Sequence, residues 1–559
     1  MNRMNTVRAL AASTLALSLV ACGGGGDAPA SDPQAPTPAP VPAPAPAPAP
    51  SFSITLDADK AIVLQGATAS VHATLHRDAG FGDAVAVALD GLPAGVSAAP
   101  VTFAAGSTEA TVILSAAPTA PHSLPTSSSV QGRAGVAASS TPLTVTVRGL
   151  PGVVDTSFGG GVVRQGIDIG EDYANAVAVQ ADGKVIVAGS SATANGTVVS
   201  LVRYGRDGGL DTTFGVGGKV LTTVGAHGND AAQAVAVQPD GRIVVAGASD
   251  QGATGLDFAV LRYQADGSLD ASFGNAGKVV ADFAGDTDRA WALLVQPDGK
   301  IVVGGEANTG TGAGRTGIDF ALLRLNGDGS IDAGFGTQGK VVTPVGAATA
   351  SDVVRGLAID GVQGEARILA IGGEGDFRAV RYRPDGAIDA GFGTLGKIDG
   401  LFNSVIGGAR AVTVLPTGQA VIAGQVNHHF AAVQLTTSGS LDAGFGTGGR
   451  FEQSLAANWN EATALVRQAD GRLILGGWAY TGAGSAGDFA ALRLNADGTI
   501  DPAFGNAGVT ITATAPGTKD DQGRALVLQA DDRVSTVRAI QAGPSNDSNH
   551  DFALVRLWL

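Results

Sequence analysis

The sequence predicts an all-β protein in which a small β-domain precedes seven repeats of a four-stranded unit. The 559-residue chain contains 83 glycines and 25 prolines, so turns are frequent. Short apolar runs alternate with Asp-Gly turns, which are strong hairpin signals, four runs to each repeat. The dipeptide Phe-Gly marks every repeat at intervals of 53 to 62 residues, at Phe158, Phe214, Phe273, Phe335, Phe392, Phe445 and Phe504.

The repeats extend over residues 152–559, and repetition at such a period indicates a closed array of similar sheets. An unpaired apolar run, GGGVVRQ, begins at Gly159, whereas the last repeat stops at DFALVRL, residues 551–557, with no outer strand after it. Pairing these two fragments would close the ring and remove two sheet edges. We therefore predict a seven-bladed β-propeller with four-stranded blades, whose N-terminal strand closes the last blade.

The repeated segment resembles the bacterial delta-60 repeat. The resemblance rests on an LD-x-x-FG-x-x-G core and a DG-K-IVVAG strand, which recur over residues 152–559 with local departures such as DGVQGEARILAIGG in the fourth copy. It implies the propeller architecture and attaches no activity to the repeat.

Residues 51–148 contain short runs with period-two alternation, including SFSITLD, SVHATLH and EATVILSA. This pattern and the length predict a small Ig-like β-sandwich. The segment GLPAGVSAAP also resembles a loop of bacterial Ig-like domains.

The N-terminus has the pattern of a signal peptide, because Arg3 and Arg8 precede the apolar stretch ALAASTLALSLVA. The stretch ends at Cys22, and LVAC resembles the lipobox of bacterial lipoproteins. This resemblance implies a lipoprotein signal peptide over 1–21, a lipidated Cys22, and membrane attachment outside the cytoplasm, at the outer membrane or cell surface. A plain secretory signal is the alternative. Residues 22–50 are a Pro/Ala-rich linker of extended polyproline II character.

Composition excludes several functional classes. Lys and Arg total 35 against 50 Asp and Glu, and no basic block is present, so nucleic acid is not an expected partner. The single Cys22 excludes intramolecular disulfides and multi-thiolate metal sites. Oxygen side chains alternate from Asn326 to Asp332, but their spacing fits turn chemistry better than an EF-hand. We find no catalytic motif and expect no catalytic residue, metal or cofactor, in a monomer.

Polar residues that recur in every repeat are assigned to the scaffold. An Asp precedes each Phe-Gly, and an Arg recurs before it in all repeats except one, which has Gln434. A group present in every blade caps turns or forms ion pairs rather than catalysing a reaction.

One rim of the ring varies, and variation on a fixed scaffold is how repeat proteins build binding sites. We predict that acidic and amide residues before the inner strands ring the channel mouth, at Asp172, Asp230, Asp288, Asp352, Asn460 and Asp521. Positions that differ from blade to blade follow them, at Asn175, Gln233, Trp291, Arg355, Arg410, Thr463 and Arg524. Trp478 and Tyr480 would add aromatic contacts from a long loop.

These features suggest that the channel mouth recognises a polar ligand, either a glycan or a peptide, in a lipid-anchored binding or scaffold protein without enzymatic activity. A hydrated mouth without a specific ligand is the simplest competing interpretation. Two other functions remain open, namely a propeller hydrolase or lyase acting on polysaccharide, and a structural adhesin or envelope-assembly partner.

Overall fold

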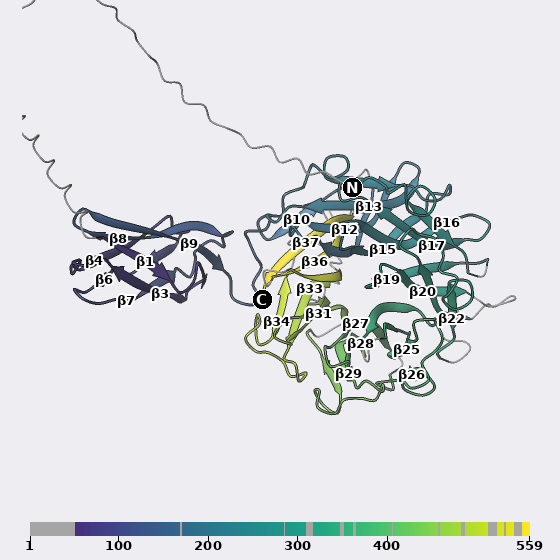
Figure 1. Ribbon diagram of the computed structural model, residues 1–559. Coiled ribbons are helices and arrows are strands. Elements are labelled where there is room, and N and C mark those ends of the chain that lie inside the picture. Colours follow the sequence, from purple (N-terminus) through teal and green to yellow (C-terminus); the bar gives the residue numbers. More distant parts are fainter. Residues whose placement is uncertain are drawn as a thin grey trace, which may run out of the picture. The chain divides into compact units, whose positions relative to one another are not determined.

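The computed structural model describes residues 51–167, 170–283, 285–308, 317–346, 351–361, 365–404, 406–456, 459–481, 487–512, 522–529, 533–541 and 550–559. These ranges contain 37 β-strands and no helix (Figure 1). None of the described residues therefore forms a helix that could cross a membrane. The predicted signal peptide, Cys22 and the linker lie outside the described residues.

The first nine strands form two sheets. One sheet has the order β1 (Phe52–Leu56), β3 (Thr68–Arg77), β7 (Glu109–Ala116) and β5 (Val96–Ala98). The other has the order β2 (Lys60–Leu64), β9 (Ala137–Arg148), β8 (Thr126–Ala134), β4 (Val85–Asp90) and β6 (Val101–Phe103). Strand β2 pairs in parallel with β9, whereas the other pairs in these two sheets are antiparallel.

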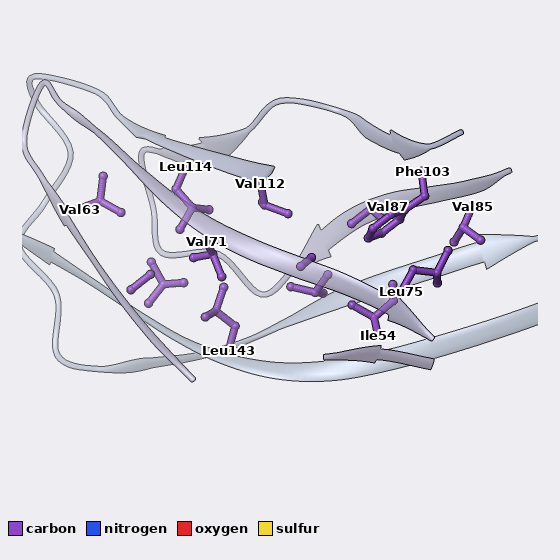
Figure 2. Packing of buried hydrophobic residues seen from close by; sticks show 14 of the residues in the cluster. Ile54, Val63, Val71, Leu75, Val85, Val87, Phe103, Val112, Leu114 and Leu143 are labelled. Atoms are coloured by element: carbon purple, nitrogen blue, oxygen red, sulfur yellow. The ribbon is translucent and has the colours of Figure 1, made fainter. Parts of the chain in front are cut away.

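Both sheets contribute to one hydrophobic core, as Figure 2 shows. Val71 and Leu114 come from the first sheet, and Val63, Val85 and Leu143 come from the second; all are at most 2% exposed. Every second residue of β3 is buried in its central part, which is the alternation expected of a strand with one face in a core.

The repeats form seven four-stranded antiparallel sheets among the described residues. The first sheet contains β11 (Asp172–Val179), β12 (Val185–Thr193), β13 (Gly196–Tyr204) and β14 (Lys219–Thr222). The second contains β15 (Asp230–Val237), β16 (Ile243–Asp250), β17 (Leu256–Tyr263) and β18 (Lys278–Ala281). The third contains β19 (Asp288–Val295), β20 (Ile301–Asn308), β21 (Ile318–Leu325) and β22 (Lys340–Thr343). The fourth sheet contains β23 (Val354–Asp360), β24 (Arg367–Gly372), β25 (Arg378–Tyr382) and β26 (Lys397–Asp399). The fifth contains β27 (Gly407–Val414), β28 (Ala420–Val426), β29 (His429–Leu435) and β30 (Arg450–Gln453). The sixth contains β31 (Asn460–Arg467), β32 (Leu473–Tyr480), β33 (Gly487–Leu494) and β34 (Val509–Thr512).

The remaining sheet joins the two ends of the repeat segment. It contains β35 (Gln522–Gln529), β36 (Arg533–Gln541), β37 (His550–Trp558) and, as its outer strand, β10 (Val162–Gln165). Val162 lies opposite Val555, and Gln165 lies opposite Phe552. The pairing of the early strand with the last repeat, which the phase of the sequence predicts, is therefore present (Figure 1).

The first strands of the seven sheets contact one another in succession, and the series closes because β35 contacts β11. Figure 1 shows the sheets arranged around a common centre. The inner strands therefore surround an axis, and side chains at their entrance face the same small volume.

The recurrent Asp and Arg build the scaffold, as predicted, together with the recurrent Phe. In the sheet of β21, Arg324 Nε donates to Asp332 at 2.7 Å, and its guanidinium carbon lies 4.4 Å from the centroid of the Phe335 ring. The same pair forms at 2.8 Å between Arg203 and Asp211. In the divergent copy, Gln434 donates to Asp442 at 2.9 Å instead of an arginine.

These arginines also link neighbouring sheets. The Nη1 group of Arg324 donates to the carbonyl of Pro384 in the turn of the next sheet, and Arg381 donates in the same way to Thr437 at 2.6 Å. Arg493 differs, because its Nη1 and Nη2 atoms are buried without a partner. The sheet that follows it is the one that contains β10 as its outer strand.

Candidate functional site

Each inner strand contains a β-bulge near its start. At the bulge, one extra residue of the inner strand has no partner opposite it in the neighbouring strand. The register of β19 against β20 shifts between Ala290 and Ala292, and that of β23 against β24 shifts between Val354 and Gly356. The extra residues of the seven sheets are the variable positions from the sequence, Asn175, Gln233, Trp291, Arg355, Arg410, Thr463 and Arg524. A bulge redirects a side chain out of the sheet pattern.

All seven redirected side chains meet at one cavity of about 230 Å³. Its remaining lining residue is Glu461, from β31. The fold thus brings together residues more than three hundred positions apart, and of the predicted site residues it gathers Trp291, Arg355, Arg410 and Arg524.

The cavity is lined by three arginines and a single glutamate. Arg410 Nε donates to Glu461 Oε1 at 2.6 Å. The guanidinium carbon of Arg355 lies 4.0 Å from the centroid of the Trp291 ring, a cation–π contact. Burial, reinforced by the nearby charge of Arg410, lowers the pKa of Arg355 to about 10, so this guanidinium stays protonated at neutral pH.

The structure places the acidic and amide residues that were predicted to ring the channel mouth away from the cavity. Asp172, Asp230, Asp288, Asp352 and Asn460 are at most 1% exposed, and none of them lines the cavity. Their side chains turn back to bind the chain that enters the inner strand. Asp521 lies outside the described residues.

Three of these carboxylates show the arrangement. Asp172 accepts a hydrogen bond from the backbone N–H of Ile167 at 2.7 Å, and Asp230 accepts one from Val224 at 2.7 Å. Asp352 accepts the N–H groups of Val345 and Gly346. Buried backbone donors require partners, and these side chains supply them. The residues therefore shape the mouth without facing a ligand.

The predicted aromatic contacts belong to a cluster beside Glu461. Trp478 lies opposite Glu461 in the pairing of β31 with β32, and its ring is 5.2 Å from that of Tyr480. Trp478 is only 5% exposed, but Trp459, 6.0 Å from it, is 44% exposed. His428 packs on Trp459 at 4.4 Å. Trp459 therefore presents the accessible aromatic surface of this cluster.

Glu461 and Trp459 are not among the residues that the sequence pattern predicts for the site. Glu461 stands two positions before the bulge residue Thr463, and the corresponding positions, such as Tyr173 and Arg289, also differ between repeats. That second variable position is the signal that would have identified it.

Three carboxylates come together elsewhere, between neighbouring sheets. Asp257, Asp282 and Asp288 each place an oxygen within 4.8 Å of the others. Burial raises the pKa of Asp257, and it raises the pKa of Asp288 to about 6, with the charge of Asp282 contributing in both cases. This oxygen set is of the kind a hard cation uses, although we expected no metal from the sequence.

A protein-family model described as "Domain of unknown function (DUF5122) beta-propeller" matches residues 180–214, 238–273, 296–335, 366–392 and 468–504. Each matched segment ends at the Phe of a Phe-Gly pair. The repeats and this match define the chain as a β-propeller repeat protein.

No curated protein matches the chain. Among solved structures, it is similar to an endo-1,4-beta-xylanase from Bacteroides thetaiotaomicron VPI-5482, at 9% identity and a TM-score of 0.25, over 46% of this chain and 87% of that one. Domains 4–9 of the surface layer protein SbsC match at 12% identity and a TM-score of 0.15, over 84% and 83% of the two chains. A DUF4784 family protein from Bacteroides caccae matches at 9% and 0.20, over 88% and 92%.

Proposed function

We propose that this chain is a binding protein of the bacterial cell envelope, whose seven-bladed propeller recognises a polar ligand at the mouth of its central channel. One observation carries the proposal. Seven structurally equivalent bulge positions carry seven side chains that vary in charge, size and polarity, and all seven line the same cavity. A purely structural ring has no need for such variety at one point, whereas a ligand site does.

The chemistry of the cavity favours binding over polysaccharide cleavage. Glycoside hydrolysis commonly uses two carboxyl groups flanking the scissile bond. Among the described residues that line the cavity, Glu461 is the one carboxylate, and it is paired with Arg410. Asp172 and Asp230, which the sequence placed at the entrance, are buried and accept backbone hydrogen bonds. We therefore rank hydrolase and lyase functions below ligand binding.

The site is tested by screening the purified full chain against glycan and peptide arrays, alongside a Trp291→Ala variant. Removing the indole should reduce the signal for any bound ligand at least tenfold, because it deletes the largest apolar surface of the cavity. Val216→Ala is the control, since Val216 is 88% exposed in a turn that follows Phe-Gly, away from the cavity. Equal loss in both variants, or undiminished binding by Trp291→Ala, would contradict a site at the mouth.

For the rest of the chain, we propose a lipid anchor at Cys22, a Pro/Ala-rich linker, and an Ig-like spacer over residues 51–148. The lipobox-like LVAC and the two-sheet sandwich support this assignment. Cys22→Ser should move the protein from the membrane fraction to the soluble fraction, because a hydroxyl cannot take the thioether-linked lipid. Retention of the variant in membranes after a carbonate wash would refute the anchor.

A further inference from the structure

We propose that the ligand of the channel mouth is a saccharide bearing a carboxylate, a uronic acid, and that Arg355 receives the carboxylate. This inference rests on the proposed function and names its substrate class. It follows from the state of Arg355, from the charge of the cavity, and from the neighbouring aromatic surface.

Arg355 differs from the scaffold arginines. Arg324 and Arg381 each have a buried carboxylate partner and a carbonyl partner in the next sheet. No hydrogen bond or ion pair joins Arg355 to another described residue, and its Nε atom is buried without a partner. The side chain is otherwise half-buried and lines the cavity, and a bidentate carboxylate is the group that best fits its fork of donors.

The fold holds this side chain in place before any ligand arrives. Arg355 is the extra residue of the bulge in β23, and its guanidinium stacks on Trp291 from the neighbouring sheet at 4.0 Å. The Nε1 atom of Trp291 is also buried without a partner. Stacking fixes the plane of the guanidinium, so little side-chain freedom remains to be lost on binding.

Two of the three carboxylates whose charges act on Arg355 are paired with other arginines. Glu461 is paired with Arg410 at 2.6 Å, and Glu306 is paired with Arg289 at 3.2 Å. Glu374, the remaining acidic group whose charge acts on Arg355, lies on an exposed turn. Three arginines against one glutamate give the cavity an excess of two positive charges, in a chain whose formal net charge is −15. An anion is therefore attracted to the mouth and repelled by the chain as a whole.

The aromatic cluster favours a saccharide over an acidic peptide. Glu461, on the cavity wall, lies opposite Trp478, which contacts the 44% exposed Trp459. An exposed indole next to fixed polar groups suits the apolar face of a sugar ring.

The experiment is isothermal titration of the purified full chain at low ionic strength with three probes. Trigalacturonate carries the carboxylates, its methyl ester is the same saccharide without charge, and triglutamate carries carboxylates on a peptide. We expect trigalacturonate to bind at least tenfold more tightly than either of the others. Arg355→Gln should remove at least tenfold of that affinity. Arg355→Lys keeps the positive charge but loses the planar pair of donors, so its affinity for trigalacturonate should lie between those of the wild-type protein and Arg355→Gln.

Arg383→Gln is the control, because Arg383 is exposed in the turn after β25 and does not line the cavity. Equal binding of the acid and its ester would overturn the inference, and so would tighter binding of triglutamate or no binding of any probe. The proposed function is judged separately. If Trp291→Ala abolishes an array signal while trigalacturonate does not bind, the mouth is a site but not for uronates.

Discussion

Arg556→Met is expected to lower the free energy of unfolding by about 3–5 kcal/mol, the range typical of breaking a buried ion pair. Arg556 Nε donates to Asp155 Oδ2 at 2.7 Å, and its Nη1 donates to the carbonyl of Arg206 at 2.7 Å. Its guanidinium carbon lies 4.3 Å from the Phe158 ring centroid. Arg556 and Asp155 are at most 1% exposed, so methionine would fill the space but leave the carboxylate without this cation.

This pair has a special position, because it joins the last strand of the chain to the first residues of the repeat segment. The variant should therefore loosen the closure specifically. Hydrogen exchange of β10 and β37 should accelerate together, and denaturant unfolding should shift to lower concentration. The measurement is amide exchange by mass spectrometry with chemical denaturation of the same samples.

Arg324→Met is the matched control, since Arg324 makes the same contacts with Asp332 and Phe335 inside a sheet of continuous chain. A smaller loss of stability is expected there, because Lys300 Nζ also donates to Asp332 at 2.9 Å, and exchange in β10 should not accelerate. If the two variants change the amide exchange of β10 equally, the ring closure does not depend on the Arg556 contacts and is stabilised by the strand pairing itself.

The repetition in the sequence explains how much of this fold could be predicted. Seven copies of one pattern average out local ambiguity, so the strand order within each sheet and the pairing of β10 with β37 follow from the phase of the repeats. The roles of the recurrent Arg and Asp were predictable for the same reason. The unpartnered donors of Arg493 were not predictable, because the other recurrent arginines, such as Arg324 and Arg381, have equivalent positions in the repeat and find carbonyl partners.

The site was only partly predictable. Variation at equivalent positions identified all seven bulge residues, since a scaffold position would repeat. The acidic residues before the strands were misassigned, because spacing places Asp230 at the entrance but does not tell whether its carboxylate faces solvent or turns back to the N–H of Val224. Contacts between sheets, such as that of Arg410 with Glu461, leave no local mark in either segment.

The carboxylate cluster of Asp257, Asp282 and Asp288 gives the second large effect, a loss of stability as the pH rises. Asp288 is fully buried, and its pKa is raised to about 6 from the ordinary 3.8. The folded state therefore binds this proton more tightly than the unfolded chain does. The stabilisation is complete below about pH 4 and is lost as the pH rises through 6, at a cost on the order of 3 kcal/mol.

Other carboxylates change the stability of the folded state in the opposite direction, at lower pH. Hydrogen bonds and the charges of arginines lower the pKa of Asp270 and Asp332 despite their burial, so their contribution is lost only as the pH falls below about 4. Between pH 5 and 8 the Asp288 effect should dominate. The melting temperature, measured with a chelator present to keep cations from the cluster, should be higher at pH 5 than at pH 8.

Asp282→Asn should reduce that difference, because it removes a negative charge that raises the pKa of both Asp257 and Asp288. Its amide oxygen can still accept the hydrogen bond that Gly285 N–H donates to Asp282. The gain in stability should therefore appear at pH 8 and nearly vanish at pH 5. Asp83→Asn, on an exposed residue of the N-terminal sandwich, should change neither value. A uniform shift of Asp282→Asn at both pH values would mean that the cluster acts by packing, since only charge repulsion between the three carboxylates depends on their ionisation.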